Sequence, residues 1–193
     1  IAMLQLAETN LAESMDALCG NAFNYEKIMK REKRIDFINY EITNYMTKVS
    51  SLKMNETDST TCNALYRCFS DIERIGDHAI NIIQYSVNEE YKLSSSEYIE
   101  EELHQLAELL SKSFSLLSTY SLDSQDECYE KIERIEDRID ELTAAYRQAQ
   151  IDRLMKKQVD AKDCVIYSEI LTDVERVSDH IMNIIEEAKR CNF

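Results

Sequence analysis

The chain has 193 residues, of which 44% are hydrophobic, and it carries a formal net charge of −15. This length is enough for one sizeable core or two small ones, and the apolar content argues against a disordered chain. The negative charge argues against nucleic-acid binding, which needs a positive field, and favours cations or basic surfaces as partners. With no Pro and only two Gly, the chain lacks the residues that tight turns and short strands require. The composition therefore predicts an all-α protein.

Apolar residues recur at helical spacing in six stretches, which are separated by short polar breaks. In the first half we expect helices at about 3–18, 25–52 and 60–91, with residues 55–59 as a break. In the second half we expect helices at about 96–120, 124–155 and 160–189. The boundary between the halves lies at 93–96, where a serine precedes a glutamate in a capping-box pattern. No apolar run approaches the roughly 18 to 20 residues that a membrane helix needs.

Two motifs of the first half return in the second half. ERIGDH begins at Glu73 and ERVSDH at Glu175, 102 residues later, while EKRID at Glu32 matches EDRID at Glu136, 104 residues later. Two motifs in the same order at nearly the same offset indicate a duplication. We therefore predict repeat 1 at residues 1–92 and repeat 2 at residues 93–193. Each is expected to form an antiparallel three-helix bundle, and the two pseudo-symmetric bundles should lie side by side.

Each repeat carries two pairs of carboxylates that are spaced four residues apart and so share a helix face. One pair is uninformative, because this chain uses the spacing freely. Antiparallel helices bring the two pairs of a repeat together, however, and four negative charges within about 6 Å need a counter-charge. A hard or borderline cation such as Mg, Ca, Mn or Fe suits clustered oxygen ligands. The predicted first carboxylate cluster is Glu32, Asp36, Glu73 and Asp77, and the predicted second carboxylate cluster is Glu136, Asp140, Glu175 and Asp179.

Other positions repeat as well, and we interpret each as structural. The histidines are expected to hydrogen-bond at the edge of a bundle rather than to bind metal, because each points about 100° away from the neighbouring Asp. The arginines should pair with carboxylates of a neighbouring helix rather than with an anion such as phosphate. The asparagines should hydrogen-bond between helices, and the first aspartates should form caps or salt bridges. These residues are Asp71, Arg74, His78 and Asn81 in repeat 1, and Asp173, Arg176, His180 and Asn183 in repeat 2.

Three further features of the sequence bear on function. The chain contains no nucleophile set, Gly-rich phosphate loop or H-E-x-x-H motif, so we do not expect an enzyme. Its six cysteines are scattered without a C-x-x-C pair, which is typical of reduced thiols in a cytosolic setting. The stretch KIMKREKR at 27–34 has five basic residues in eight. We expect it to be a solvated helix face paired with nearby acids, and the alternative is a surface that faces an anionic partner.

The phrase E-R-I-G-D-H-A-x-N-I, its degenerate copy ERVSDH and the upstream E-x-x-I-D of each half resemble the PhoU family of phosphate-transport regulators. The resemblance covers essentially the whole chain. It implies an acidic cluster in each bundle that can carry multinuclear metal, often iron, with Zn, Ni, Mn or Mg as other candidates. The eight carboxylates of the two clusters would be the ligands. In the second cluster, ERIEDRID also offers Glu133 with Asp137, and only the EKRID match favours Glu136 with Asp140.

The stretch EKRIDFINYEITNYMTKVS, followed by DIERIGDHAINII, resembles most the PhoU-like domain at the C-terminus of bacterial sodium-dependent phosphate cotransporters. This implies a cytoplasmic regulatory domain at the inner face of the plasma membrane, with the membrane domain of the transporter as its partner. The missing initiator Met fits a membrane part before residue 1, and residues 27–34 would then lie near the membrane. The alternatives are a free-standing PhoU regulator and a purely structural acidic docking module. We also expect that the domain can form a homodimer.

Overall fold

The computed structural model describes residues 2–94 and 96–191, and these residues form six long α-helices and one short 3₁₀ turn. The elements are α1 (Ala2–Leu18), α2 (Tyr25–Ser50), α3 (Glu56–Val87), α4 (Glu97–Ser118), η1 (Leu122–Ser124), α5 (Gln125–Met155) and α6 (Ala161–Cys191). The predicted all-α class and all six predicted helices are confirmed. Within the described ranges, no helix combines the length and the apolar character that crossing a membrane requires.

The start of one helix and the N-cap of another differ from the prediction. Helix α3 begins at Glu56, inside the predicted break, because the side chain of Asn55 accepts a hydrogen bond from the backbone N–H of Asp58 at 2.8 Å. Helix α4 begins where it was predicted, but the hydroxyl of its N-cap residue Ser96 makes no capping hydrogen bond. The connection into α4 is held instead by Asp163, whose carboxylate accepts the backbone N–H of Ser94 at 3.1 Å.

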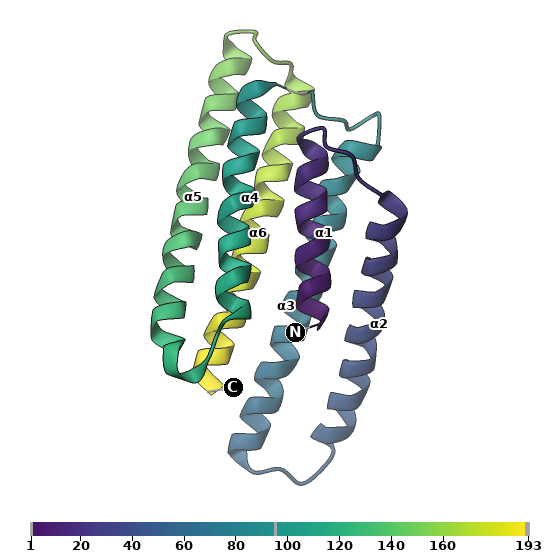
Figure 1. Ribbon diagram of the computed structural model, residues 1–193, viewed down its shortest axis with the longest axis vertical. Coiled ribbons are helices and arrows are strands. Elements are labelled where there is room, and N and C mark those ends of the chain that lie inside the picture. Colours follow the sequence, from purple (N-terminus) through teal and green to yellow (C-terminus); the bar gives the residue numbers. More distant parts are fainter. Residues whose placement is uncertain (1, 95, 192–193) are drawn as a thin grey trace.

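The helices of the two halves stand side by side as upright rods, with α1 and α4 on the near side in Figure 1 and α3 and α6 behind them. The sequence left open whether the two bundles share a core. They do, because one continuous apolar cluster includes Ile75 of α3, Leu106 of α4, Ile139 of α5 and Ile181 of α6, all of them fully buried. Burial of each such side chain stabilises the fold by about 1.5–3 kcal/mol. The long pair α3 and α6 forms the seam between the two halves.

Polar residues of the repeated motif cross this seam. His78 of α3 donates to the carboxylate of Asp173 on α6 at 2.7 Å, and His180 of α6 donates to Asp71 on α3 at 2.8 Å. The two imidazole rings stack with their centroids 5.5 Å apart. The predicted hydrogen bonds of the histidines and the predicted pairing of the aspartates are therefore present. Their location differs from the prediction, because they join the two halves instead of lying at the edge of one bundle.

The repeated asparagines take part in the same contacts. Asn81 donates to Asp173 at 3.3 Å and Asn183 donates to Asp71 at 3.4 Å, so their predicted role between helices is confirmed. Each aspartate thus accepts hydrogen bonds from a histidine and an asparagine of the opposite half. The motif that carries the carboxylate clusters is thereby fixed in place by its own neighbouring residues.

Candidate metal centres

The first carboxylate cluster lies where the outer helix α2 packs along α3. The side chain of Glu32 points inward and the residue is only 7% exposed, whereas Asp36 of the same helix is exposed. Glu73 and Asp77 of α3 lie near Glu32 and Asp36. The charges of these four carboxyls act on one another. The structure therefore brings together the four residues that the repeat pattern singled out in the first half.

Glu32 is the most perturbed carboxyl of this cluster. Burial, together with the charges of Asp36 and Asp77, raises its pKa to about 7, although a hydrogen bond with Asn10 opposes the shift. Its Oε2 atom is shielded from solvent and has no hydrogen-bond partner. A buried acceptor that stays unpaired costs about 1–3 kcal/mol. In the absence of a cation, a proton on Glu32 is the remaining way to reduce this cost at neutral pH.

The neighbouring residue Gly76 makes the deep position of Glu32 possible. A Cβ atom at Gly76 would lie 2.9 Å from Oε2 of Glu32 and 3.3 Å from Cδ1 of Ile35, so any larger residue would displace the carboxyl. In repeat 2 the matching position is Ser178, which is buried, and the matching carboxyl of Glu136 is only half-buried. Serine adds at this position the Cβ atom that the deep position of Glu32 excludes in repeat 1.

The second carboxylate cluster differs from the first because an arginine binds one of its carboxylates with two hydrogen bonds. The guanidinium of Arg147 donates to both carboxylate oxygens of Glu175 at 2.6 Å, and the hydroxyl of Thr143 donates to the same carboxylate at 2.5 Å. Burial acts to raise the pKa of Glu175, but these hydrogen bonds outweigh it and hold the pKa below its usual value. In repeat 1 the position that matches Arg147 is Thr43, which carries no charge.

The other residues of the second cluster bear on which residues of α5 would be its ligands. Burial raises the pKa of Glu136, with Asp140 as the next cause, and Asp140 is shifted in the same direction by burial and by Glu175. Glu133, the competing candidate, is exposed and accepts a hydrogen bond from the hydroxyl of Tyr129 at 3.2 Å. Carboxylates of α6 act on both Glu136 and Asp140, but Asp137 acts on them as well, so the choice of Glu136 with Asp140 stays a prediction.

The donor chemistry of the clusters fits a hard or borderline cation, because all the candidate ligands are carboxylates. In residues 2–94 and 96–191, no three His, Cys, Asp or Glu side chains already have their donor atoms gathered for a metal ion. Binding at the first cluster would therefore require rotation of the outer carboxylates. The space for this exists, since a depression of about 370 Å³ lies over Glu32, Asp36 and Asp77. The orphaned Oε2 of Glu32 would be available as an inner ligand, so the first cluster fits a cation better than the second.

Sequence reasoning was wrong about one arginine and missed another. Arg74 contacts Asp77 of its own helix at 3.8 Å, with both side chains exposed, and does not anchor a carboxylate of a neighbouring helix. The arginine with that role is Arg147, which the repeat comparison could not show because repeat 1 has no equivalent. A usable signal was its position, seven residues after Asp140 and hence on the same face of α5.

The basic stretch 27–34 of α2 also departs from expectation. Arg31 is paired as expected, since it donates to Glu13 at 2.5 Å and to the side-chain oxygen of Asn10 at 2.6 Å. The expectation of pairing with nearby acids is wrong for the rest, because no carboxylate in the described part of the chain pairs with them. These unpaired residues are Lys27, Lys30, Lys33 and Arg34, and together with Leu6 and Phe37 they line a shallow hollow on α2. Phe37 is 52% exposed there.

Comparison with known proteins gives three concordant results. The PhoU domain family matches residues 1–86 and 103–188. The phosphate-specific transport system accessory protein PhoU homolog 1 of Thermotoga maritima is 23% identical over 194 aligned positions, which cover 96% of this chain and 80% of that protein.

Two solved structures have the same fold. The crystal structure of PhoU from Pseudomonas aeruginosa superposes with a TM-score of 0.85 at 17% identity, over 99% of this chain and 92% of that one. The phosphate transport system regulatory protein PhoU from Streptococcus pneumoniae gives a TM-score of 0.65 at 22% identity, over 99% and 91% of the two chains. Since the family match covers most of the sequence, the chain belongs to the PhoU domain family, a family of accessory and regulatory proteins of phosphate transport.

Proposed function

We propose that this chain is a metal-binding regulatory domain that controls phosphate transport as the cytoplasmic part of a sodium-dependent phosphate cotransporter. The observation that carries the metal part is the carboxyl of Glu32, which is buried, lacks a hydrogen-bond partner at Oε2 and faces three further carboxyls. The first cluster has only the exposed Arg74 beside Asp77 as a counter-charge, and a bound cation would supply one at the buried carboxyl of Glu32. Glu32 would be the inner ligand, and Asp36, Glu73 and Asp77 would bind from the outer side.

The proposal distinguishes the two clusters in affinity. In the second cluster, Arg147 already neutralises one of the four carboxylates and occupies both of its oxygens. A cation there would face a net charge closer to zero and would have fewer free oxygens to bind, so its attraction would be weaker. We therefore propose that Glu136, Asp140, Glu175 and Asp179 form the weaker of two sites. Iron is the favoured metal, and Zn, Ni, Mn and Mg are the other candidates.

Metal retention tests this function directly. The metal-free protein would be incubated separately with Fe, Mn, Zn, Ni and Mg ions, desalted and subjected to elemental analysis. We expect stoichiometric retention of at least one of these metals, and loss of the tightly held fraction in the variant Glu73→Ala/Asp77→Ala. Glu97→Ala/Glu101→Ala is the matched control, because it removes two exposed carboxyls with the same spacing from α4. Retention of none of the five metals by the wild-type protein would disprove the metal-binding role.

The unpaired basic residues of α2 support a position beside a membrane. Basic side chains near an anionic lipid surface each contribute about 1 kcal/mol of attraction, and exposed aromatic residues such as Phe37 suit the interface. We propose that residues 27–34 face the inner surface of the membrane when the domain is attached to its transporter.

Vesicle binding at low salt checks this orientation. Lys27→Glu/Lys30→Glu is expected to weaken binding to vesicles that contain phosphatidylglycerol by about tenfold or more, since two attractive charges become repulsive. Lys156→Glu/Lys162→Glu makes the same change in net charge at exposed positions elsewhere and should have a smaller effect. Equal losses in the two variants, or no binding by the wild-type chain, would contradict the proposed orientation.

A further inference from the structure

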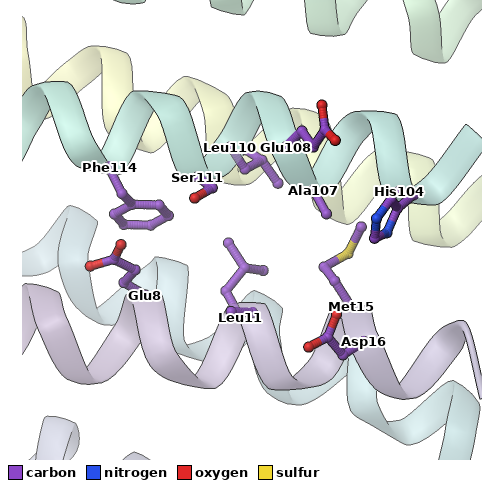
Figure 2. A pocket seen from close by; sticks show the side chains of 11 residues that line it. Glu8, Leu11, Met15, Asp16, His104, Ala107, Glu108, Leu110, Ser111 and Phe114 are labelled. Carbon is purple, nitrogen blue, oxygen red and sulfur yellow. The ribbon is translucent and has the colours of Figure 1, made fainter. Parts of the chain in front are cut away.

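A groove with a cavity of about 230 Å³ lies between α1 and α4, on the near side of the molecule and away from the helix pairs that carry the carboxylate clusters. Figure 2 shows Leu11 of α1 facing Leu110 of α4 across it, with Phe114 at one end and Met15 at the other. Small residues such as Ala12 and Ala107 border the gap, so the two helices do not fill it with their own side chains.

Acidic side chains stand around this apolar groove. Glu8 and Asp16 come from α1 and Glu108 comes from α4 (Figure 2). No ion pair with another described residue neutralises Glu8 or Asp16. Glu108 contacts Lys112 only at 3.9 Å with both side chains 63% exposed, a pair that contributes little. Helix α1 itself contains no Lys or Arg. The groove therefore combines an apolar floor with a negatively charged rim.

We propose that this groove binds a short basic amphipathic helix of a partner protein. In this mode of recognition an amphipathic helix places apolar anchors, spaced three and four residues apart, into a hydrophobic groove. Leu or Phe anchors would enter between Leu11 and Leu110, and Lys or Arg on either side would reach the three carboxylates. The cavity is smaller than the roughly 300–1,000 Å³ typical of small-molecule sites, which favours a side-chain anchor over a free ligand.

The charge of the occupant follows from the rim and from the whole chain. A chain with a net charge of −15 attracts cationic partners over a distance and repels anionic ones. This inference rests on the proposed function in one respect, which is the source of the helix. Cytoplasmic segments of membrane transporters carry an excess of Lys and Arg, so such a segment of the transporter is the occupant that we propose.

A labelled synthetic helix tests the groove with the whole chain. The probe is a peptide of Leu and Lys with Leu at helical spacing, and its control is a scrambled peptide of the same composition. Fluorescence anisotropy should show that the ordered peptide binds at least about tenfold more tightly than the scrambled one. Ala107→Phe fills the groove and should weaken binding of the ordered peptide by a similar factor. Thermal unfolding would show that this variant still folds.

Two charge variants separate docking from general attraction. Glu8→Gln/Asp16→Asn/Glu108→Gln should weaken peptide binding and reduce its salt dependence, whereas Glu89→Gln/Glu90→Gln/Glu97→Gln removes three charges elsewhere and should have a smaller effect. Equal losses in the two variants, or undiminished binding by Ala107→Phe, would overturn the proposal. Association of two copies that Ala107→Phe abolishes would overturn it as well, by identifying a different occupant. Metal retention is independent of these results, so the two proposals can fail separately.

Discussion

Replacement of Glu32 by Gln is expected to stabilise the metal-free protein at pH 8 by about 3 kcal/mol and to abolish metal binding at the first carboxylate cluster. The size of the effect comes from the pKa of Glu32, which the fold raises from 4.5 to about 7. Below about pH 4.5 the carboxyl is protonated in both the folded and the unfolded chain and causes no difference. As the pH rises from 4.5 to 7, the unfolded chain releases the proton first, so the free energy of unfolding falls. Above pH 7 the full penalty remains.

Gln keeps the shape of the side chain but has no proton to lose, so the penalty is absent at every pH. Its amide N–H groups can also donate to the surrounding carboxylates. Urea unfolding with a chelator present would therefore show a large difference between Glu32→Gln and wild type at pH 8 and a small one at pH 5. Glu41→Gln, on an exposed position of the same helix, is the control and should leave stability unchanged within about 0.5 kcal/mol.

Added metal should reverse the order of stability. A ligand that binds only the folded state stabilises it, so metal should raise the free energy of unfolding of the wild-type protein and raise that of Glu32→Gln less, through the weaker second site alone. If Glu32 destabilises the metal-free fold and stabilises the metal-bound fold, then direct binding of the metal by Glu32 is the best explanation. A wild-type stability that stays constant between pH 5 and 8 would contradict the buried ionisable role of Glu32.

The six helices were predictable because each long apolar stripe has the helical period and few glycines interrupt it. The start of α3 could not be predicted in the same way. Residues 56–59 are held in the helix by the cap at Asn55 and not by burial of an apolar face. The contacts between His78 and Asp173 and between His180 and Asp71 were also beyond the sequence. They depend on how α3 packs against α6, and a motif read within one repeat contains no information about its partner in the other repeat.

The grouping of each set of four carboxylates was predictable from the four-residue spacing and the antiparallel helices. The differences between the two clusters, in the burial of one glutamate and in the presence of a paired arginine, were not predictable. They arise at positions where the two repeats have different residues. Gly76 leaves room for the buried Glu32, whereas repeat 2 has Ser178 at the matching position and a half-buried Glu136. Arg147 neutralises Glu175 through two hydrogen bonds, while Thr43 at the matching position gives the first cluster no such partner. A duplication identifies the shared residues, but the unshared ones determine how each copy works.

Replacement of Arg147 by Ala tests this view of the second cluster. Glu175 would lose its bidentate partner beside Asp140 and Asp179, and the metal-free protein should lose about 2–3 kcal/mol of stability. Arg138→Ala is the control on the same helix. It breaks an exposed pair with Glu141, which should cost less than about 1 kcal/mol. The double variant Arg147→Ala/Glu175→Gln should recover much of the loss, because it removes the uncompensated charge together with its partner.

The same variant should also gain metal. Without Arg147 the second cluster has four carboxylates and no bidentate arginine, which is the condition of the first cluster. Elemental analysis after reconstitution should therefore show more metal per chain in Arg147→Ala than in wild type, and the extra metal should be absent when Asp179 is also replaced by Ala. If Arg147→Ala destabilised the protein but bound no additional metal, repulsion among carboxylates would not be enough to create a site. The deep position of Glu32 against Gly76 would then be the decisive feature of the first cluster.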